Sequence, residues 1–376
     1  MQQFGNVLSW GSDVDPVTIE QARLVAGMPI VKSHVALMAD AHVGKGSTIG
    51  SVIPTTGAVI PSAVGVDIGC GMAALETGAT AADLPDDLSR LHGRIAEVVP
   101  AGVGQGHDTE QQGLDIPDHF TPREASTALR QLGSLGSGNH FVEVCLDERD
   151  VVWIVLHSGS RGIGNQLAQK HIRIAHDLCT RWHIPLPNRD LAYLAEGTPE
   201  FDAYIRDMTW AQGYALLNRQ RMLDAIWRVF REAVPVATLV QPINTHHNFT
   251  RKEHHFGRDV WLTRKGAIRA GTGELGIIPG SMGTRSYITR GKGSPASYCS
   301  SSHGAGRRLS RSQAKRLLTE QSLREAMAGK AWNGDARALL DEHPLAYKDV
   351  DRVMADQADL VDVVHTLHQV LNYKGT

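Results

Sequence analysis

The stretch Val64–Gly71, which reads VGVDIGCG, constrains the fold of this chain more than any other. It places Asp67 and Cys70 three residues apart among glycines, which let a backbone pack closely against its neighbours. A run rich in valine and isoleucine, Ser51–Pro61, precedes it and is typical of a buried strand. The fold must therefore bring a carboxylate and a thiol into or beside a core. Because a buried carboxylate needs a partner, and because a carboxylate with a thiolate suits a divalent metal of intermediate softness, the stretch indicates a metal site.

Later segments of the chain each offer a histidine beside small residues. His140 follows a glycine- and serine-rich stretch and enters a predicted strand, and His157 ends the apolar run VVWIVL. Neighbouring side chains of a strand point to opposite faces, so only one of His246 and His247 is expected to bind an ion. His303 lies in a loop of small residues and is left over as a histidine that can meet a ligand closely. The mixed oxygen, sulfur and nitrogen set is enough for two metal ions if Cys70 bridges them.

Two basic loops predict an anionic substrate. Arg161 lies in the Ser/Gly loop His157–Asn165, ahead of a predicted helix with Asn165 as N-cap, and helix N-termini favour anions. The run after His303 is a solvated face when taken alone, but beside the histidine loop phosphate binding is the better interpretation. This run comprises Arg307, Arg308, Arg311, Lys315 and Arg316. A free histidine beside metals and anion loops could be a general acid or base, or a nucleophile. The residues alone therefore predict metal-dependent phosphoryl or nucleotidyl transfer.

Strands and helices alternate irregularly along the chain. Apolar patterns predict strands over 34–38, 141–146, 151–156 and 260–265, and helices over 15–26, 82–98, 199–234 and 360–371. Because there is no regular strand–helix alternation and no internal repeat, we expect an α+β fold in which mixed β-sheets pack as a sandwich-like core with peripheral helices. Candidate ligands spread from residue 67 to residue 303, so we expect a single domain over 1–376.

Composition limits the partners and the compartment. The net charge of −2 excludes a generally basic protein, so nucleic acid would be held by a local patch. The four cysteines show no CxxC pair, which favours a reducing compartment. The first residues lack a basic start followed by an apolar run, and no apolar run approaches the roughly 18 residues that a membrane span needs. We expect a cytoplasmic protein without a membrane segment.

Several separate blocks of the sequence resemble the RtcB-type RNA-splicing ligases, in that family's order and over nearly the whole chain. These blocks are DAHVGKGSTIGSVIPT, AVGVDIGCGM, LGSGNHFVEV, LHSGSRGIGN, the HHN stretch, IIPGSMG, SSHGAGR and AYKD. The resemblance implies an RtcB-like fold and a manganese enzyme that uses GTP. It implies that RNA ends with a 2′,3′-cyclic phosphate or 3′-phosphate are joined to 5′-hydroxyl ends, through a guanylylated histidine and an RNA-ppG intermediate, in RNA repair or tRNA splicing. An activating protein partner is left open.

The resemblance also assigns roles to individual positions. Cys70 would bridge two Mn²⁺ ions, with Asp67 and His140 completing one site and His157 and His247 the other. His303 would attack the α-phosphorus of GTP. The positions that match guanine-nucleotide contacts are Asn139, Glu143, Ser281, Ser286, Ala305, Tyr347 and Lys374. Arg161 and Arg311 match positions near the RNA phosphates, and Asp40 and His42 are assigned to the RNA as well. Ala39 and Ala41, which flank Asp40, depart from the common pattern, and the segment 100–130 is short, which bears on the choice of RNA.

Two other functions are weighed against ligation. A metal-dependent RNA cyclic phosphodiesterase would open cyclic phosphates without joining ends, and it would need neither a spare histidine nor guanine contacts. A non-catalytic RNA-binding protein of the same fold would be expected to have lost part of the set Cys70, His157, His247 and His303, all of which are present. Neither the client RNA nor the oligomeric state follows from the sequence.

Overall fold

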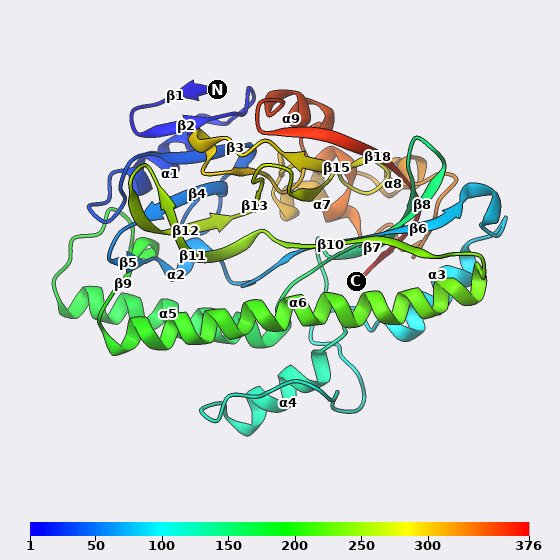
Figure 1. The fold of residues 1–376 in the computed structure, drawn as a ribbon, viewed down its shortest axis with the longest axis horizontal. Coiled ribbons are helices and arrows are strands. Elements are labelled where there is room, and N and C mark those ends of the chain that lie inside the picture. Colours follow the sequence, from blue (N-terminus) through cyan, green and yellow to red (C-terminus); the bar gives the residue numbers. More distant parts are fainter. Residues whose placement is uncertain (376) are drawn as a thin grey trace.

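Two mixed β-sheets form the centre of the computed structural model, which describes residues 1–375 (Figure 1). In spatial order, the first sheet within these residues consists of β1 (Gln2–Gln3), β2 (Val7–Ser9), β3 (Val35–His42), β4 (Ile49–Thr55), β12 (Arg258–Lys265) and β11 (Asn248–His255). The second consists of β10 (Leu239–His246), β6 (Gly71–Thr80), β8 (Val151–Ser158), β7 (Phe141–Leu146), β18 (Val361–Lys374), β15 (Ser286–Gly291) and β14 (Leu275–Pro279), and β17 (Ala331–Trp332) pairs with β18. Two short ribbons complete the strands: β13 (Ala267–Arg269) with β16 (Ser300–Ser302), and β5 (Ala58–Val59) with β9 (Leu194–Ala195).

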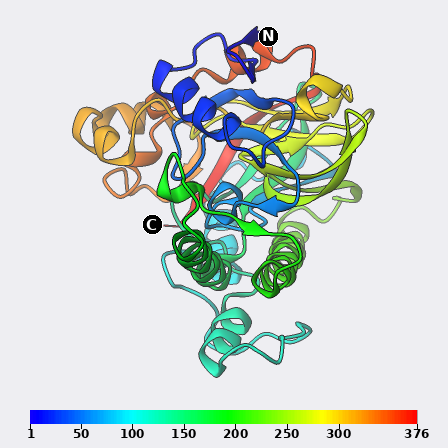
Figure 2. The same ribbon diagram turned by 90° about the vertical axis from the view of Figure 1, so that its left-hand side faces the viewer.

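Helices lie on the outside of these sheets. The longest, α5 (Arg161–Arg181) and α6 (Pro199–Ala233), run side by side along one face, and Figure 2 shows them end-on beneath the strands. The other α-helices of residues 1–375 are α1 (Pro16–Ala26), α2 (Pro61–Val64), α3 (Ser89–Val98), α4 (Pro122–Gln131), α7 (Arg311–Leu317), α8 (Glu320–Ala326) and α9 (Val350–Asp356). Short 3₁₀ turns occur at Ala81–Asp83, Arg189–Leu191, Pro295–Ser297, Leu340–Glu342 and Pro344–Ala346. Within residues 1–375, none of the helices combines the length and the apolar character that crossing a lipid bilayer requires.

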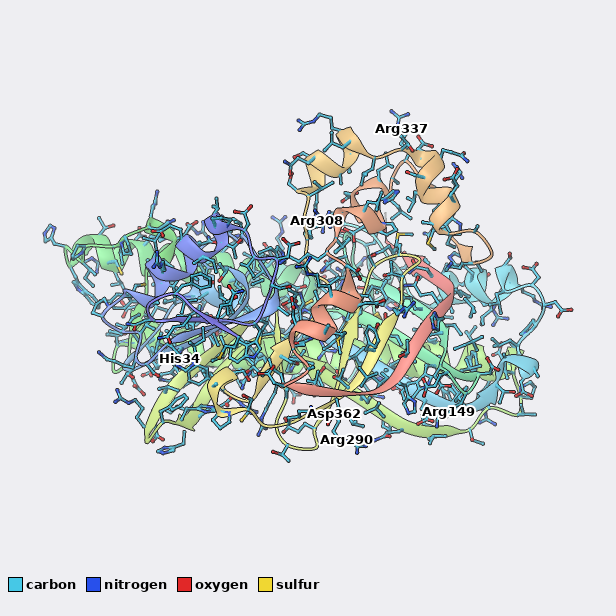
Figure 3. The ribbon with its side chains drawn as sticks, turned by 90° about the horizontal axis from the view of Figure 1, so that it is seen from above. His34, Arg149, Arg290, Arg308, Arg337 and Asp362 are labelled. Carbon is cyan, nitrogen blue, oxygen red and sulfur yellow. The ribbon has the colours of Figure 1, made fainter. Side chains whose placement is uncertain are left out.

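The packing of α6 explains why this helix is so long. It contacts β6, β8 and β10 of the second sheet and also packs on α5, so that its buried face runs along two clusters of the core. Met222 and Ile226 pack with the apolar side chains of β6 and β8, whereas Tyr204 and Met208 pack against α5. The helix therefore forms a rigid floor under the ends of several strands. Viewed from above, α7 and α8 stand out to one side, near Arg308 and Arg337 (Figure 3).

Helix starts follow from local chemistry, as the sequence predicts. Asp15 caps α1 by accepting from the Val17 N–H, with Pro16 at the first helical position. Thr198 caps α6 in the same way, ahead of Pro199. The helices predicted over 15–26 and 199–234 are thus confirmed, and so are the α+β class with mixed sheets and peripheral helices.

Three predicted elements were wrong. The segment 360–371 is not a helix but part of β18, which lies between β7 and β15. Its apolar residues fit a helical period, but it is rich in valine, and two open strand edges offer backbone partners that a helix would leave unpaired. The helix predicted over 82–98 begins only at Ser89, because Pro85 disfavours helix before it and Asp87 accepts from the Ser89 N–H. The helix after the 157–165 loop begins one turn early, at Arg161, with Ser160 rather than Asn165 as N-cap.

Segments near the two ends of the chain contact each other. β18 lies in the middle of the second sheet, and the Trp10 indole N–H donates to the Asp359 carboxylate over 3.0 Å. These contacts favour the predicted single domain over residues 1–376, which stays a prediction.

The strand assignment of the C-terminal segment predicts a difference between two of its positions. Leu371 is fully buried in the second sheet, so Leu371→Ala should lower the free energy of unfolding by about 2–5 kcal/mol. Val363 is 49% exposed on the same strand, and Val363→Ala should change it by about 1 kcal/mol or less. Urea denaturation of the two variants measures this difference. Equal small effects would show that the strand does not pack as described.

Candidate active site

Strand pairing delivers the candidate metal ligands to one place. β6, β8 and β7 are neighbours in the second sheet, and the register pairs Met72 with His157 and Phe141 with His157. Cys70 precedes β6, and His140 precedes β7, so both flank the end of β8. β10 pairs with the other edge of β6 and ends at His246, which puts the next residue beside the Cys70 loop. Residues distant in sequence therefore become neighbours because backbone ladders fix their register.

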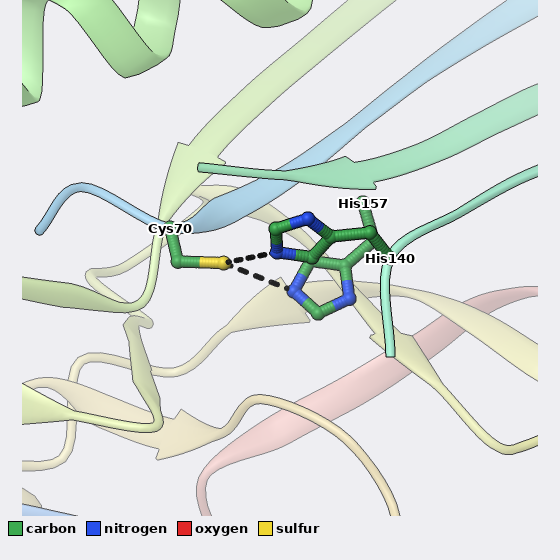
Figure 4. Close-up of side chains that lie close together, drawn as sticks. All are labelled: Cys70, His140 and His157. Carbon is green, nitrogen blue, oxygen red and sulfur yellow. Dashed lines mark hydrogen bonds between the residues drawn. The ribbon is translucent and has the colours of Figure 1, made fainter. Parts of the chain in front are cut away.

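The side chains of all five predicted ligands form one cluster. The Cys70 Sγ lies 3.4 Å from His140 Nε2 and 3.3 Å from His157 Nε2, as the dashed lines in Figure 4 mark. His157 Nε2 is 3.3 Å from His247 Nε2, and His140 Nε2 is 3.1 Å from Asp67 Oδ2. The cluster is the one that the sequence predicts.

Backbone carbonyls fix the tautomers of two of these histidines. His140 Nδ1 donates to the Leu135 carbonyl over 2.9 Å, and His157 Nδ1 donates to the Asn139 carbonyl over 3.1 Å. Since a carbonyl only accepts, Nδ1 of each ring carries a proton, and Nε2 of each ring faces Cys70. Burial lowers the pKa of His157 and of His247 well below the usual value, so both rings are neutral. Imidazole nitrogens, a thiol and a carboxylate that converge in one buried place are the donors that a divalent cation of intermediate softness binds; the donor set fits a metal.

The pKa values of the two acidic members of the cluster, Asp67 and Cys70, are shifted in opposite directions. Burial opposes ionisation of Asp67, but the His140 hydrogen bond and charge and the Ser160 N–H outweigh it and lower the pKa of Asp67 to about 2. Burial and the nearby Asp67 charge raise the pKa of the Cys70 thiol well above its usual value. A thiolate at this position therefore needs a cation. Gly159 makes the arrangement possible, since a Cβ there would collide with the Asp67 carboxylate.

In the predicted anion-binding loop, His157–Asn165, the bound anion is a side chain of the protein itself, the Asp67 carboxylate. The Ser160 N–H at the start of α5 donates to Asp67 Oδ1 over 2.9 Å, so this helix N-terminus faces the Asp67 carboxylate. Arg161 donates to the Ser134 hydroxyl and to the carbonyls of Gly102 and Gln105. Its guanidinium thus ties loops together, and this position does not favour the predicted contact with RNA phosphates.

A cavity of about 420 Å³ adjoins the cluster. All the positions that the resemblance assigns to GTP line it: Asn139, Glu143, Ser281, Ser286, Ala305, Tyr347 and Lys374. Asp67, Cys70, His157, His247, His303, His42 and Arg311 line it as well. The metal cluster, the free histidine and the predicted nucleotide positions therefore share one hollow.

Two polar groups on the wall of this cavity are poised for a ligand. The Ser286 hydroxyl is buried without a hydrogen-bond partner among the described residues. Burial raises the pKa of Glu143 to about 8, although the Lys374 charge and the Asn372 amide oppose that shift. A buried hydroxyl without a partner and a carboxyl group of raised pKa are both costly to leave facing empty space.

His303 lies in the loop after β16, at the edge of the metal cluster. Its ring centroid is 4.8 Å from that of His247, and its Nδ1 is 2.7 Å from Asp40 Oδ2. Asp40 is fully buried, and the charge and hydrogen bond of His303 lower its pKa although burial opposes this. Asp40 was assigned to RNA, but its carboxylate faces His303 instead. His42 donates from Nδ1 to the Asp40 carbonyl, and burial lowers its pKa to about 4, so it is a neutral group on the cavity wall.

Much of the basic run after His303 is neutralised within the protein. Arg311 donates to Asp341 Oδ2 over 2.6 Å and to Glu342 Oε1 over 2.7 Å, and Arg307 and Lys315 pair with the same two acids. The predicted phosphate-binding run is therefore largely a set of internal ion pairs. Arg308 and Arg316 are exposed and form no ion pair with any residue of 1–375.

Sequence reasoning missed Lys265, which also lines the cavity. It is buried at the end of β12 and donates to the carbonyls of Lys45 and Ser62. Burial lowers its pKa to about 8. A lysine that ends an apolar strand and precedes a glycine was the available signal.

Comparison with known proteins connects this site to a family. The chain matches the profile described as tRNA-splicing ligase RtcB over residues 21–116 and 108–375. It is 46% identical over 391 residues to the RNA-splicing ligase RtcB of Escherichia coli K12, covering 97% of this chain and 96% of that protein. It is 34% identical over 410 residues to the RNA-splicing ligase RtcB of Mycobacterium tuberculosis (88% and 94% covered). Against the tRNA-splicing ligase RtcB of Methanococcus maripaludis, the identity is 31% over 412 residues (89% and 86% covered).

The position of the Cys70 sulfur beside two histidine nitrogens predicts that the thiol is needed for metal binding. Cys70→Ala removes the sulfur that faces two histidines, so the chain should retain less Mn²⁺ after dialysis than the wild type. Elemental analysis of the dialysed protein measures the bound metal. Cys179→Ala is the matched control, because Cys179 is equally buried but lies on α5 outside the cluster, and it should bind as the wild type does. Wild-type metal content in Cys70→Ala would remove Cys70 from the site.

Proposed function

This chain belongs to the RtcB family, and on that premise we propose that it is a GTP-dependent RNA ligase. It would join RNA 3′-phosphate or 2′,3′-cyclic-phosphate ends to 5′-hydroxyl ends, in RNA repair or tRNA splicing, as a cytoplasmic enzyme. The names of its relatives support the ligase activity. The observation that carries the proposal is the position of His303, which shares one cavity with a metal-capable cluster and with every predicted nucleotide contact.

The cluster would hold two Mn²⁺ ions. Cys70 would be shared, Asp67 and His140 would bind one ion, and His157 and His247 the other. When bound, the metal supplies positive charge that offsets the charge of the phosphates. The Nδ1–H bonds of His140 and His157 to backbone carbonyls support this assignment, because they leave Nε2 of each ring facing the shared thiol.

His303 would be the nucleophile. Its Nδ1 lies 2.7 Å from Asp40 Oδ2, and a proton held on Nδ1 by that carboxylate would leave the Nε2 lone pair for attack on the α-phosphorus of GTP. A nitrogen–phosphorus bond forms, and the bond to the β-phosphate oxygen breaks, so that pyrophosphate leaves with the electron pair. The imidazole becomes positively charged in this step, and the buried Asp40 carboxylate stabilises that charge without reorganisation.

The nucleotide would lie along the wall that carries Glu143, Ser286 and Lys374. Glu143 offers a carboxyl group to the N–H edge of guanine, and the Ser286 hydroxyl offers a hydrogen bond that no described residue takes up. The Lys374 ammonium lies 3.4 Å from Glu342 Oε2, and both residues line the cavity. Asn139, Ser281, Ala305 and Tyr347 complete this wall.

Ligation would follow in two transfers. An oxygen of the RNA 3′-phosphate attacks the phosphorus on His303, the nitrogen–phosphorus bond breaks, and RNA-ppG forms. The 5′-hydroxyl of the second RNA then attacks the RNA phosphate, and GMP leaves. Arg161, Arg311, Asp40 and His42 stay our proposals for RNA contacts, and Arg311 and His42 among them line the cavity. An activating protein partner also stays a proposal.

A cyclic phosphodiesterase without ligase activity is the rival function. It would use the metal cluster but would have no need of a nucleophilic histidine, whereas His303 lies 2.7 Å from the buried Asp40 carboxylate at the edge of that cluster. The pair therefore favours ligation.

Loss of the nucleophile should abolish the covalent intermediate. His303→Ala incubated with Mn²⁺ and GTP labelled at the α-phosphate should carry no label, whereas the wild type should carry an acid-labile adduct that mass spectrometry maps to His303. His254→Ala alters an exposed histidine of β11 and should be labelled normally. Labelling of the His303→Ala protein would refute the assignment.

The buried carboxylate should matter almost as much as the ring it orients. Asp40→Asn keeps the volume but removes the charge opposite Nδ1, so the rate of guanylylation should fall by about 10²–10⁴-fold. Single-turnover labelling at saturating GTP measures this rate. Asp207→Asn alters another buried histidine–aspartate pair, with His171 on α5, and controls for general loss of stability. An unchanged rate in Asp40→Asn would mean that the pair has no part in the attack.

A further inference from the structure

The middle of α6 carries two adjacent polar residues that the proposed chemistry does not use. Asn218 and Arg219 are both fully buried, although neither type is common in a protein interior. A buried guanidinium is costly unless its donors are satisfied. Burial lowers the pKa of Arg219 to about 10, which leaves it charged at neutral pH. The groups that satisfy these two side chains reveal what the residues are for.

Arg219 binds backbone next to three of the predicted ligands. Its Nη1 donates to the Gly69 carbonyl over 2.9 Å and to the Ser158 carbonyl over 3.0 Å. Gly69 precedes Cys70, and Ser158 follows His157. Its Nε donates to Asn244 Oδ1 over 2.7 Å, and its Nη2 lies 3.1 Å from His246 Nδ1, next to His247. One guanidinium thus joins the three segments that carry Cys70, His157 and His247.

Asn218 connects the remaining segments to the same helix. Its Oδ1 accepts from the N–H groups of Gly133 and Ser134 over 2.7 and 3.2 Å. Its Nδ2 donates to the Ser134 carbonyl, the Ser158 hydroxyl and the Gly159 carbonyl over 3.1, 3.2 and 3.2 Å. The Ser158 hydroxyl in turn donates to the Leu135 carbonyl, the group that fixes the His140 ring.

Helix α6 packs closely against the loop that carries Gly69 and Cys70. Gly69 has φ +72°, and a Cβ there would lie within 3.0 Å of the α6 backbone at Gln212. The helix and the Cys70 loop are therefore in direct contact, with no room for water between them at this point.

We propose that Asn218 and Arg219 are positioning residues that hold the four ligand-bearing segments at metal-binding distance. This inference rests on the proposed metal-dependent function. The hydrogen-bond partners of the two side chains, among residues 1–375, all belong to the segments that carry the predicted ligands. Arg219 also places a buried positive charge under the loop that carries Asp67 and Cys70, before any metal enters.

Cobalt binding tests the proposal without using activity. Co²⁺ bound by a thiolate gives a charge-transfer absorption band, so titration of the metal-free full-length chain reports both affinity and coordination by Cys70. Arg219→Met should weaken Co²⁺ binding by about 10–100-fold and diminish the band at saturation, because the ligands lose their support. Asn218→Ala should weaken binding in the same direction while leaving the guanidinium in place.

Arg264→Met is the matched control. Arg264 is also a fully buried arginine, but it donates to the Glu253 carboxylate, the Ser300 hydroxyl and the Tyr298 carbonyl, none of which adjoins a ligand. This variant should lose thermal stability and keep the wild-type Co²⁺ affinity and band. If Arg219→Met does not fold, Arg219→Lys takes its place. This variant keeps the charge but cannot reach all the acceptors, so its Co²⁺ affinity should fall below that of the wild type.

The possible outcomes separate the two levels of inference. A wild-type chain without the thiolate band would overturn the proposed metal function itself. A wild-type band and affinity in both the Arg219 and Asn218 variants would overturn the positioning role. An equal loss in Arg264→Met would also overturn it, since any buried substitution would then have the same effect.

Discussion

The convergence of nitrogen, sulfur and oxygen donor atoms at Cys70 is the constraint on which the rest of this structure depends. Imidazole nitrogens and a thiol sulfur face one another at 3.3–3.4 Å in a buried place, next to an ionised carboxylate. Gathering these polar groups away from water costs free energy, so the surrounding fold must hold them in position. It does so with strand ladders that fix register, carbonyls that accept from histidine Nδ1 groups, and a 35-residue helix beneath. Gly69 and Gly159 follow from the same need, because backbone, carboxylate and helix approach too closely for a side chain at either position.

The side chains that cluster around Cys70 could be named as candidate ligands from the sequence because each carries its local signal with it. A metal-binding side chain between small residues, at the end of an apolar run, needs no knowledge of tertiary structure to be noticed, and the family resemblance added the order of the blocks. The supports could not be found in this way. Arg219 and Asn218 lie inside a regular amphipathic helix, and nothing in the helical period shows that two polar residues point inward to four separate loops. Their role exists only in the assembled fold, where their hydrogen-bond partners come from four segments that are far apart in the sequence.

The difference between local signals and tertiary contacts also explains the errors in predicted secondary structure. The long helix α6 was predicted within one residue because cap, proline and periodicity agree, and these are local. The segment Val361–Lys374 was misassigned because its apolar spacing suits either a helix or a strand. The choice was made by β7 and β15, which flank it from positions far away in the sequence. The position of Asp40 shows a related limit: a motif shows that an acid and a histidine lie near one another, but only the fold shows that the acid is buried behind His303.

The charges that line the cavity connect the proposed nucleotide wall with the metal cluster. Arg307, Arg311 and Lys315 are paired with Asp341 and Glu342, and Lys374 lies against Glu342, so the basic groups around the nucleotide wall carry little uncompensated charge. Lys45 and Lys265 also line the cavity and form no ion pair among residues 1–375, so a triphosphate would meet both compensated and uncompensated basic groups. Under the proposed function, the metal cluster adds positive charge next to the phosphates, and the internal ion pairs serve to shape the wall. The near-neutral overall charge of the chain is consistent with a protein that concentrates positive charge at its reacting centre and leaves its surface mixed.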